Sequence, residues 1–172
     1  QVRLLTVASR AFFDAPPLDF AEHPLLTSRG LLFVAGRGQD DLLEKEWQVL
    51  GAANDRIRRL SAAQACRMVP VLRPGKVIGA VYDPAAADID VNALHQGYLR
   101  GLRRQGGRIF GDAEVTALTH ADGCWRVSAG GRDYAAPRVL NAAGAWADTI
   151  ARLAGVVPLG LQPRRRSVFV FP

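Results

Sequence analysis

The chain has 172 residues, of which 49% are hydrophobic and 22% are charged. This composition is typical of a soluble globular protein with one large or two small domains. No apolar run approaches the roughly 18 residues that cross a bilayer, so we expect a cytoplasmic protein without a transmembrane segment. Association with a membrane surface stays open. The two cysteines, Cys66 and Cys124, form no CxxC pair and are expected to be free thiols.

The net charge of +6 comes from arginine far more than from lysine. Two clusters carry much of it: Arg100, Arg103, Arg104 and Arg108, and then Arg164, Arg165 and Arg166. A basic non-catalytic module that binds nucleic acid is one interpretation of such patches. However, no aromatic residues interleave them, and no helix-turn-helix, zinc or RNP pattern accompanies them. We therefore expect a solvated basic face, or arginines that serve an anionic small molecule, and no nucleic-acid partner.

The first part of the chain contains three predicted elements: a helix over 1–14, a strand over 31–35 and a helix over 39–53. Gly36 and Gly38 lie between the strand and the second helix, as in a dinucleotide fingerprint, but the third glycine is absent. Asp40 and Asp41 would also put negative charge where a pyrophosphate must bind. They suit the N-terminus of a helix instead, and we reject the fingerprint.

The middle of the chain contains five predicted elements: an extended piece over 56–60, a helix over 61–67, a strand over 76–82, a helix over 90–105 and a short strand over 108–110. Ser61 and Gln64 form a capping-box pattern that opens the first of these helices. Asp90 or Asn92 caps the second. Its last turn is basic, which the helix dipole favours without any partner.

A three-stranded meander is predicted next, with strands over 114–120, 124–128 and 133–135 and a hairpin turn at Asp122-Gly123. The stretch 138–155 follows, and the rest of the chain is arranged around it. Val139 and Leu140 predict a short buried strand, residues 142–145 carry nothing larger than a methyl group, and a helix over 146–153 stops at Gly155. This pattern fits either a nucleotide or flavin approach site or a βα turn that is small only for packing.

The fold class predicted from these elements is α/β (α+β mixed). Residues 91–155 run helix, strand, meander, strand, helix, whereas 21–84 and the part from 156 onward resemble a separate inserted layer. A final strand is predicted over 166–171. Because the chain opens at Gln1 in a helical pattern and ends at Pro172 directly after an apolar run, we expect an internal fragment of a longer protein.

Several segments together resemble the FAD-dependent D-amino-acid oxidase superfamily, with the closest likeness to the bacterial D-arginine dehydrogenases. They are ADIDVNALHQGYLRGLRRQGG, the meander, VLNAAGAWADTIARLAGVVPLGLQPRRRSVFVF and the shorter EHPLL, AQAC, VPVL and YDP. The resemblance implies a fragment of a Rossmann-like FAD domain with a β-meander, plus part of a mixed-sheet substrate domain. It assigns 1–20 and 85–155 to the FAD domain, and 21–84 and 156–172 to the substrate domain. The N-terminal GxGxxG of the family lies outside this sequence.

The resemblance implies FAD as the cofactor and assigns roles to positions along the meander and the central stretch. Val115 matches the position whose backbone contacts the adenine part of FAD. Ala142, Ala143 and Gly144 match the small segment that lies against the cofactor, with Trp146 packed beside it. We expect Gly144 to be the most sensitive of these, because a Cβ there would meet the cofactor or a backbone that needs a positive φ.

Two positions are implied to bind substrate. Arg166 matches an arginine that reaches the substrate carboxylate, and a guanidinium can pair a carboxylate in a bidentate way. If this segment is a strand, Arg165 should point away from Arg166. Leu31 occupies the position that supplies a carboxylate to the guanidinium of D-arginine in the resembled enzymes. An apolar side chain cannot do this, so we expect a neutral or apolar D-amino acid as the substrate.

The activity implied is oxidation of the CH–NH2 group of a D-amino acid to an imino acid, which hydrolyses to a 2-oxo acid. A glycine- or sarcosine-oxidase-like amine oxidase is the alternative. No metal and no side chain acting as acid, base or nucleophile is expected, because the flavin carries the chemistry. The three histidines, His23, His95 and His120, are expected at the surface or in packing roles. Oxygen or a quinone is the electron acceptor, and the fragment alone is expected to be inactive.

Overall fold

The computed structural model of the chain describes residues 2–52 and 54–169. Its contacts divide the chain into two compact units, residues 1–108 and 109–172. Helices and antiparallel sheets occur in both units, which confirms the predicted mixed α/β class. The expected assignment of segments to an FAD domain and a substrate domain concerns the intact protein and stays a prediction.

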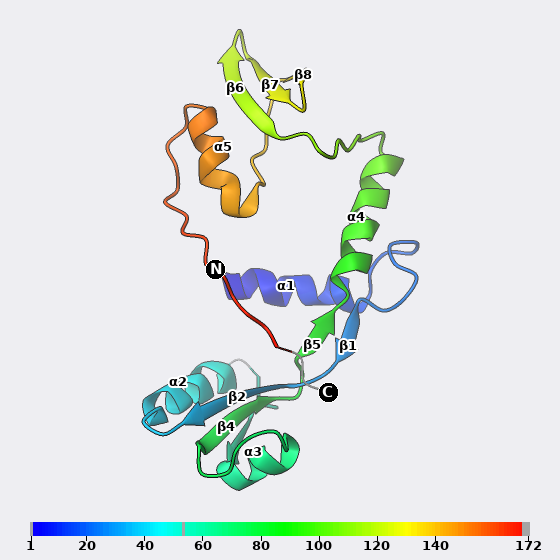
Figure 1. The fold of residues 1–172 in the computed structure, drawn as a ribbon. Helices are drawn as coiled ribbons and strands as arrows, with labels where there is room; N and C mark the ends of the chain where they lie inside the picture. The colour runs from blue at the N-terminus through cyan, green and yellow to red at the C-terminus, as the bar shows by residue number, and fades with distance from the viewer. Residues whose placement is uncertain (1, 53, 170–172) are drawn as a thin grey trace. The chain divides into compact units, whose positions relative to one another are not determined.

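The first unit is built on a three-stranded antiparallel sheet. Its strands are β2 (Leu31–Gly36), β3 (Arg58–Ser61) and β4 (Val77–Asp83), and β4 lies in the middle. Two helices, α2 (Asp40–Gly51) and α3 (Ala62–Met68), pack against it. Figure 1 shows them on either side of the sheet. All five elements were predicted, β3 only as an extended piece.

The core of this unit consists of two apolar clusters on opposite faces of the sheet. Ala80 and Val81 are both fully buried, and because neighbouring strand residues point to opposite faces, each belongs to a different cluster. The buried members on the α2 side are Ala35, Leu43, Ile57 and Val81. Those on the α3 side are Leu60, Ala65, Val77 and Ala80. Each helix therefore covers one face of the sheet.

Two helices of the first unit begin at the caps that the sequence predicts. Ser61 Oγ accepts from the backbone N–H of Gln64 at 3.3 Å, and the Ser61 N–H donates to Gln64 Oε1 at 2.8 Å, which completes the capping box of α3. Asp90 Oδ1 accepts from the N–H of Ala93 at 2.8 Å at the start of α4 (Val91–Arg104). Of the two residues proposed to cap α4, the structure therefore selects Asp90.

An aromatic cluster joins α4 to the first helix, α1 (Val2–Asp14), which was predicted. The rings of Phe12 and Phe20 lie 4.9 Å apart between centroids, and those of Phe20 and Tyr98 lie 5.1 Å apart. Gly97 allows this approach, because a Cβ there would lie 2.5 Å from the Phe20 ring and 2.7 Å from its carbonyl oxygen. A side chain on this face of α4 would push the loop at Phe20 away.

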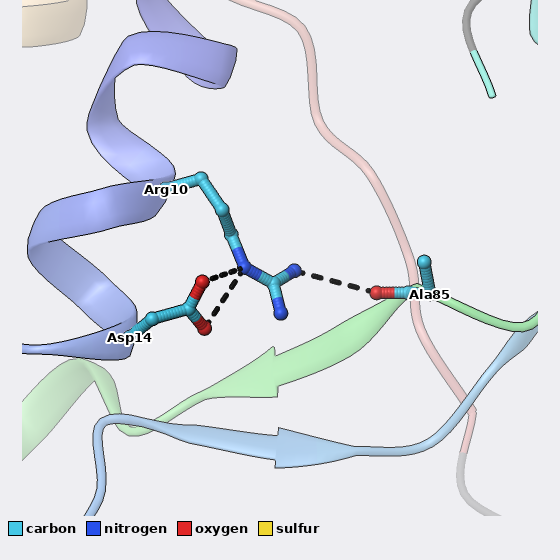
Figure 2. Close-up of polar contacts among 3 residues, drawn as sticks. All are labelled: Arg10, Asp14 and Ala85. Atoms are coloured by element: carbon cyan, nitrogen blue, oxygen red, sulfur yellow. Dashed lines mark hydrogen bonds and ion pairs between the residues drawn. The ribbon is translucent and has the colours of Figure 1, made fainter.

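A second, two-stranded sheet in the first unit was not predicted. It pairs β1 (Leu26–Ser28) antiparallel with β5 (Ala87–Ile89) (Figure 1). Near it, Arg10 of α1 reaches the link between β4 and β5, where its Nη1 donates to the Ala85 carbonyl at 3.4 Å (Figure 2). The Asp14 carboxylate accepts from Arg10 Nε at 2.9 Å, and this hydrogen bond raises the pKa of Arg10 above its ordinary value.

The second unit contains the predicted meander and one α-helix. The strands are β6 (Val115–Ala121), β7 (Cys124–Ala129) and β8 (Arg132–Ala136), paired antiparallel in that order. The β6–β7 turn has positive φ at both central residues, 53° at Asp122 and 72° at Gly123, as the hairpin signal requires. The short helix α5 (Ala147–Leu153) packs against β6 and is preceded by one 3-10 turn, η1 (Gly144–Trp146).

Three predicted strands are wrong within the described residues. The segments 108–110, 139–140 and 166–169 are extended or irregular and join no sheet, and positions 170–171 lie outside the described residues. Their β-branched and aromatic residues favour extended backbone, but a strand also needs a hydrogen-bonded neighbour. No described segment supplies that neighbour, so propensity alone does not make these segments strands.

Candidate flavin and substrate site

The turn between residues 141 and 147 is held by one side chain. Asn141 Oδ1 accepts from the N–H of Ala143 at 3.2 Å, and Asn141 Nδ2 donates to the carbonyl of Ala147 at 2.8 Å. The amide therefore bridges the small-residue turn and the first residue of α5. Sequence analysis missed this role, although an Asn side chain that bonds the backbone two residues later is a known turn signal.

Gly144 has the backbone conformation that the sequence suggests. Its φ is +56°, which side-chain-bearing residues rarely adopt, and a Cβ built there would meet no heavy atom within 4 Å. Glycine is thus required by the backbone and not by a neighbouring group of the described chain. The space in front of the turn is open, and contact with a cofactor there stays a prediction.

Two predicted cofactor positions, one on the meander and one on the turn, lie together. Val115 at the start of β6 and Trp146 in η1 line a single hollow of about 300 Å³, together with Glu114, Thr149 and Ile150. Trp146 is 70% exposed, so its ring is not used in packing within the unit. Ala142 and Gly144 are exposed as well, and Ala143 is half-buried. The structure therefore brings Val115 and Trp146 together, and a shared site with Ala142, Ala143 and Gly144 stays a prediction.

The predicted substrate positions fall in different units. Leu31 is half-buried at the first position of β2, opposite Asp83 of β4. Arg166 is exposed in the segment 156–169, which has no helix or strand. The strand predicted around Arg166 is therefore absent from the described residues, and the orientation of Arg165 relative to Arg166 stays a prediction. A shared role for Leu31 and Arg166 in one site stays a prediction.

One buried carboxylate was missed by sequence analysis. Asp148, in the first turn of α5, is 7% exposed and accepts from the backbone N–H groups of Leu159 and Leu161. An Asp at a helix start has an ordinary explanation in the helix dipole, so the sequence gave no reason to look further. Its partners lie 11 and 13 residues away, and only the fold brings them together.

The remaining titratable groups show no second site. His23, His95 and His120 are all exposed, as expected. Across residues 2–52 and 54–169, no three His, Cys, Asp or Glu side chains gather as metal ligands would.

Within the same ranges, no helix has the length and apolar character needed to cross a membrane. Arg103 and Arg104 occupy the last turn of α4, where the dipole accounts for them.

Comparison with known proteins identifies the family. Residues 2–172 match the family described as FAD dependent oxidoreductase. The chain belongs to this family. Its members depend on FAD, which agrees with the cofactor expected from the sequence. This match confirms the expected superfamily. It does not confirm the closer likeness to D-arginine dehydrogenases.

The names of individual relatives describe enzymes that act on small amines. The chain is 33% identical to mitochondrial dimethylglycine dehydrogenase of Homo sapiens over 90 residues, which are 52% of this chain and 10% of that protein. Its fold is similar to glycine oxidase from Geobacillus kaustophilus, with a TM-score of 0.74 and 22% identity over 88% of this chain and 42% of that one. Iminodiacetate oxidase from Chelativorans sp. BNC1 gives a TM-score of 0.64 and 25% identity, again over 88% and 42%.

The chain spans less than half of those solved relatives. The residues it does contain fit part of an FAD group. The turn 142–145 carries no side chain beyond a methyl, the space in front of Gly144 is open, and the adjoining hollow is lined by an exposed indole and an apolar strand residue. Close backbone approach and an apolar wall are what a flat, largely aromatic ligand requires.

Proposed function

We propose that the full-length protein is an FAD-dependent amine oxidoreductase that oxidises the carbon–nitrogen bond of a small amino acid. Membership in the FAD-dependent family is the observation that carries this proposal. The named relatives support it, because glycine, dimethylglycine and iminodiacetate all join an amine nitrogen to a carbon that bears a carboxylate. Bound FAD would supply the redox chemistry by accepting the hydride from the carbon next to the nitrogen.

The chain's own residues have two tasks in this proposal. The turn at Ala142–Gly144, with Val115 and Trp146 beside it, provides backbone and apolar surface for part of the cofactor. Arg166 neutralises and orients the substrate carboxylate, for which its exposed, always charged guanidinium is suited. Holding the carboxylate fixes the neighbouring carbon relative to the cofactor, which is a positioning effect and involves no proton transfer by Arg166.

The substrate side chain is the finer part of the proposal. Leu31 offers no carboxylate to a cationic side chain, and leaving a guanidinium unpaired in a pocket costs several kcal/mol. This favours a neutral substrate over D-arginine. Two neutral classes remain. The names of the relatives favour glycine and N-substituted glycines, and the apolar Leu31 favours a D-amino acid with an apolar side chain.

A substrate panel on the intact, FAD-loaded protein tests this function. Glycine, N-methylglycine, D-leucine and D-arginine are mixed anaerobically with the enzyme, and bleaching of the flavin absorbance gives the rate of reduction without any choice of electron acceptor. We expect reduction by a neutral substrate, and the class that gives the highest rate identifies the preference. If no member of the panel bleaches the flavin, the proposed function is wrong.

The role of Leu31 has a matched test. Leu31→Glu is expected to raise kcat/KM for D-arginine relative to D-leucine by about tenfold or more, since a new ion pair in a pocket contributes over 1 kcal/mol. Val34→Glu is the control, because it places the same charge on the opposite face of the same strand, where Val34 is 39% exposed. A wild-type enzyme that already prefers D-arginine would show that Leu31 does not decide specificity.

A further inference from the structure

In the described part of the second unit, one charged side chain is buried, the carboxylate of Asp148. Oδ1 accepts from the N–H of Leu159 at 3.0 Å, and Oδ2 accepts from the N–H of Leu161 at 2.8 Å. A carboxylate that is only 7% exposed is unfavourable unless its oxygens are hydrogen-bonded. Both oxygens are bonded here, and both bonds go to one segment of backbone. The geometry is that of a clamp between α5 and the segment 159–161.

Apolar packing does little to hold this segment. Leu159 is 83% exposed and Leu161 is 47% exposed, although each donates its N–H to the same buried carboxylate. Gly160 between them has φ of +79°, a conformation that lets both N–H groups point the same way. The segment is therefore fixed through its backbone by Asp148 and not by burial of its side chains.

The link between the clamp and Arg166 is short and stiff. Pro163 has a fixed φ, and it restricts Gln162 before it to extended backbone. Arg164 follows, with its Nη2 donating to Gln162 Oε1 at 3.1 Å, and Arg166 lies five residues after Leu161. The direction in which the arginine run leaves the clamp is therefore set largely by where Leu159 and Leu161 are held.

The candidate cofactor turn directly precedes the N-terminus of the same helix. Asp148 is two residues after Trp146, and Asn141 bonds to Ala147 directly before it. We propose that Asp148 is a positioning residue that fixes the Arg164–Arg166 run relative to the cofactor turn. This inference rests on the proposed function for the role of Arg166. It adds that substrate binding depends on a carboxylate that touches neither substrate nor cofactor.

The clamp itself is tested without any activity. In the full-length protein, Asp148→Asn keeps one acceptor but turns an NH2 group toward a backbone N–H. We expect the rates of amide hydrogen exchange at Leu159 or Leu161 and of trypsin cleavage after Arg164–Arg166 to rise about tenfold. A tenfold rise corresponds to the loss of one hydrogen bond to a charged group. Asp122→Asn, in the exposed β6–β7 turn, is the control and should change neither. Unchanged exchange in Asp148→Asn would overturn the proposal.

The positioning role is tested by separating binding from chemistry. Asp148→Asn should raise KM for the preferred amino acid about tenfold, with kcat and FAD affinity changed less than about threefold. Combined with Arg166→Lys, the effect should be clearly less than additive, because both changes disturb one interaction. Asp148→Glu, which keeps both oxygens, should recover part of the KM. A fall in FAD affinity that matches the rise in KM, or full additivity, would overturn the role.

A second variant covers the case in which Asp148→Asn does not fold. Gly160→Ala leaves the carboxylate in place and strains the backbone between its two donors, where a Cβ meets nothing within 4 Å. Gly160→Ala should raise the amide exchange rate and the KM as much as Asp148→Asn does. A KM for Gly160→Ala equal to that of the wild-type enzyme would overturn the proposal. If the wild-type enzyme oxidises no amine, the proposed function fails, whereas exchange and cleavage still decide whether the clamp exists.

Discussion

The two units of the chain differ in how completely they bury their own apolar side chains. In the first unit, buried residues form two clusters that fill both faces of the sheet, and helices cover each face. In the described part of the second unit, the buried apolar residues are Leu118 and Ala129. Both units have well-formed hydrogen-bonded sheets, so the difference lies in packing and not in secondary structure.

Several large apolar side chains of the second unit are exposed. Leu140 is 90% exposed, Val157 is 85% exposed and Trp146 is 70% exposed. The candidate cofactor turn lies among these residues. The comparison therefore separates a unit with two filled core clusters from a unit that buries few apolar side chains.

The largest expected effect tests the closed packing of the first unit. Gly97→Ala would place a Cβ 2.5 Å from the Phe20 ring and 2.7 Å from its carbonyl oxygen, so either the loop or α4 must move. We expect a loss of about 1–3 kcal/mol in the free energy of unfolding, as for other overpacked cores. Urea denaturation followed by circular dichroism measures it.

Gly101→Ala is the matched control on the same helix. Nothing lies within 4 Å of a Cβ at Gly101, so the substitution should stabilise the protein by up to about 1 kcal/mol through helix propensity. If both substitutions had the same effect, the aromatic cluster would not be tightly packed. The first unit would then be no more closed than the second.

The next effect tests the open surface of the second unit. Gly144→Ala and Gly155→Ala both force an L-residue to a positive φ, +56° and +66°, with no heavy atom within 4 Å of the new Cβ. Each should cost the apoprotein about 1–2 kcal/mol of stability. Only Gly144→Ala should also weaken FAD binding, by about tenfold or more, because only there would the methyl meet the cofactor.

Titration of FAD into the two full-length apoproteins, followed by flavin fluorescence, makes this comparison. Equal affinities would mean that the turn at Gly144 does not contact the cofactor and that the hollow beside Trp146 serves another purpose. Equal losses of apoprotein stability, measured in the same samples, show that the two variants are matched in backbone strain.

Sequence signals that act over a few residues predicted most elements of both units. The capping box at Ser61, the cap at Asp90 and the hairpin turn at Asp122-Gly123 each depend on groups within three residues. The pair β1 and β5 was missed, because three-residue strands are too short to show alternation. The strand predicted at 139–140 failed for the opposite reason, since its apolar residues favour a strand that has no described neighbour.

The candidate site was only partly predictable for the same physical reason. Gly144 could be predicted, because the need for a positive φ is a property of one residue and its turn. Asp148 could not, because its importance comes from two N–H groups 11 and 13 residues away in a segment without regular structure. Local chemistry is visible in a sequence, whereas a contact that closes a loop depends on the finished fold.

The smallest effect concerns how α1 is attached to the first unit. Arg10 and Asp14 are each about half exposed, and such surface pairs contribute only about 0.2–1 kcal/mol. Asp14 also lies at the C-terminal end of α1, where the helix dipole disfavours a carboxylate. Asp14→Asn should therefore leave stability nearly unchanged, since the lost pair and the relieved dipole interaction offset each other.

Arg10→Gln removes more, because it also removes the hydrogen bond to the Ala85 carbonyl (Figure 2). We expect it to destabilise the protein by about 0.5–1 kcal/mol, with the ion-pair share disappearing near 1 M salt. A guanidinium is charged throughout the neutral and mildly alkaline range, and the hydrogen bond to Asp14 raises the pKa of Arg10 further, so its contribution should not vary over that range. Equal effects of Asp14→Asn and Arg10→Gln would show that the bond to Ala85 contributes nothing to stability.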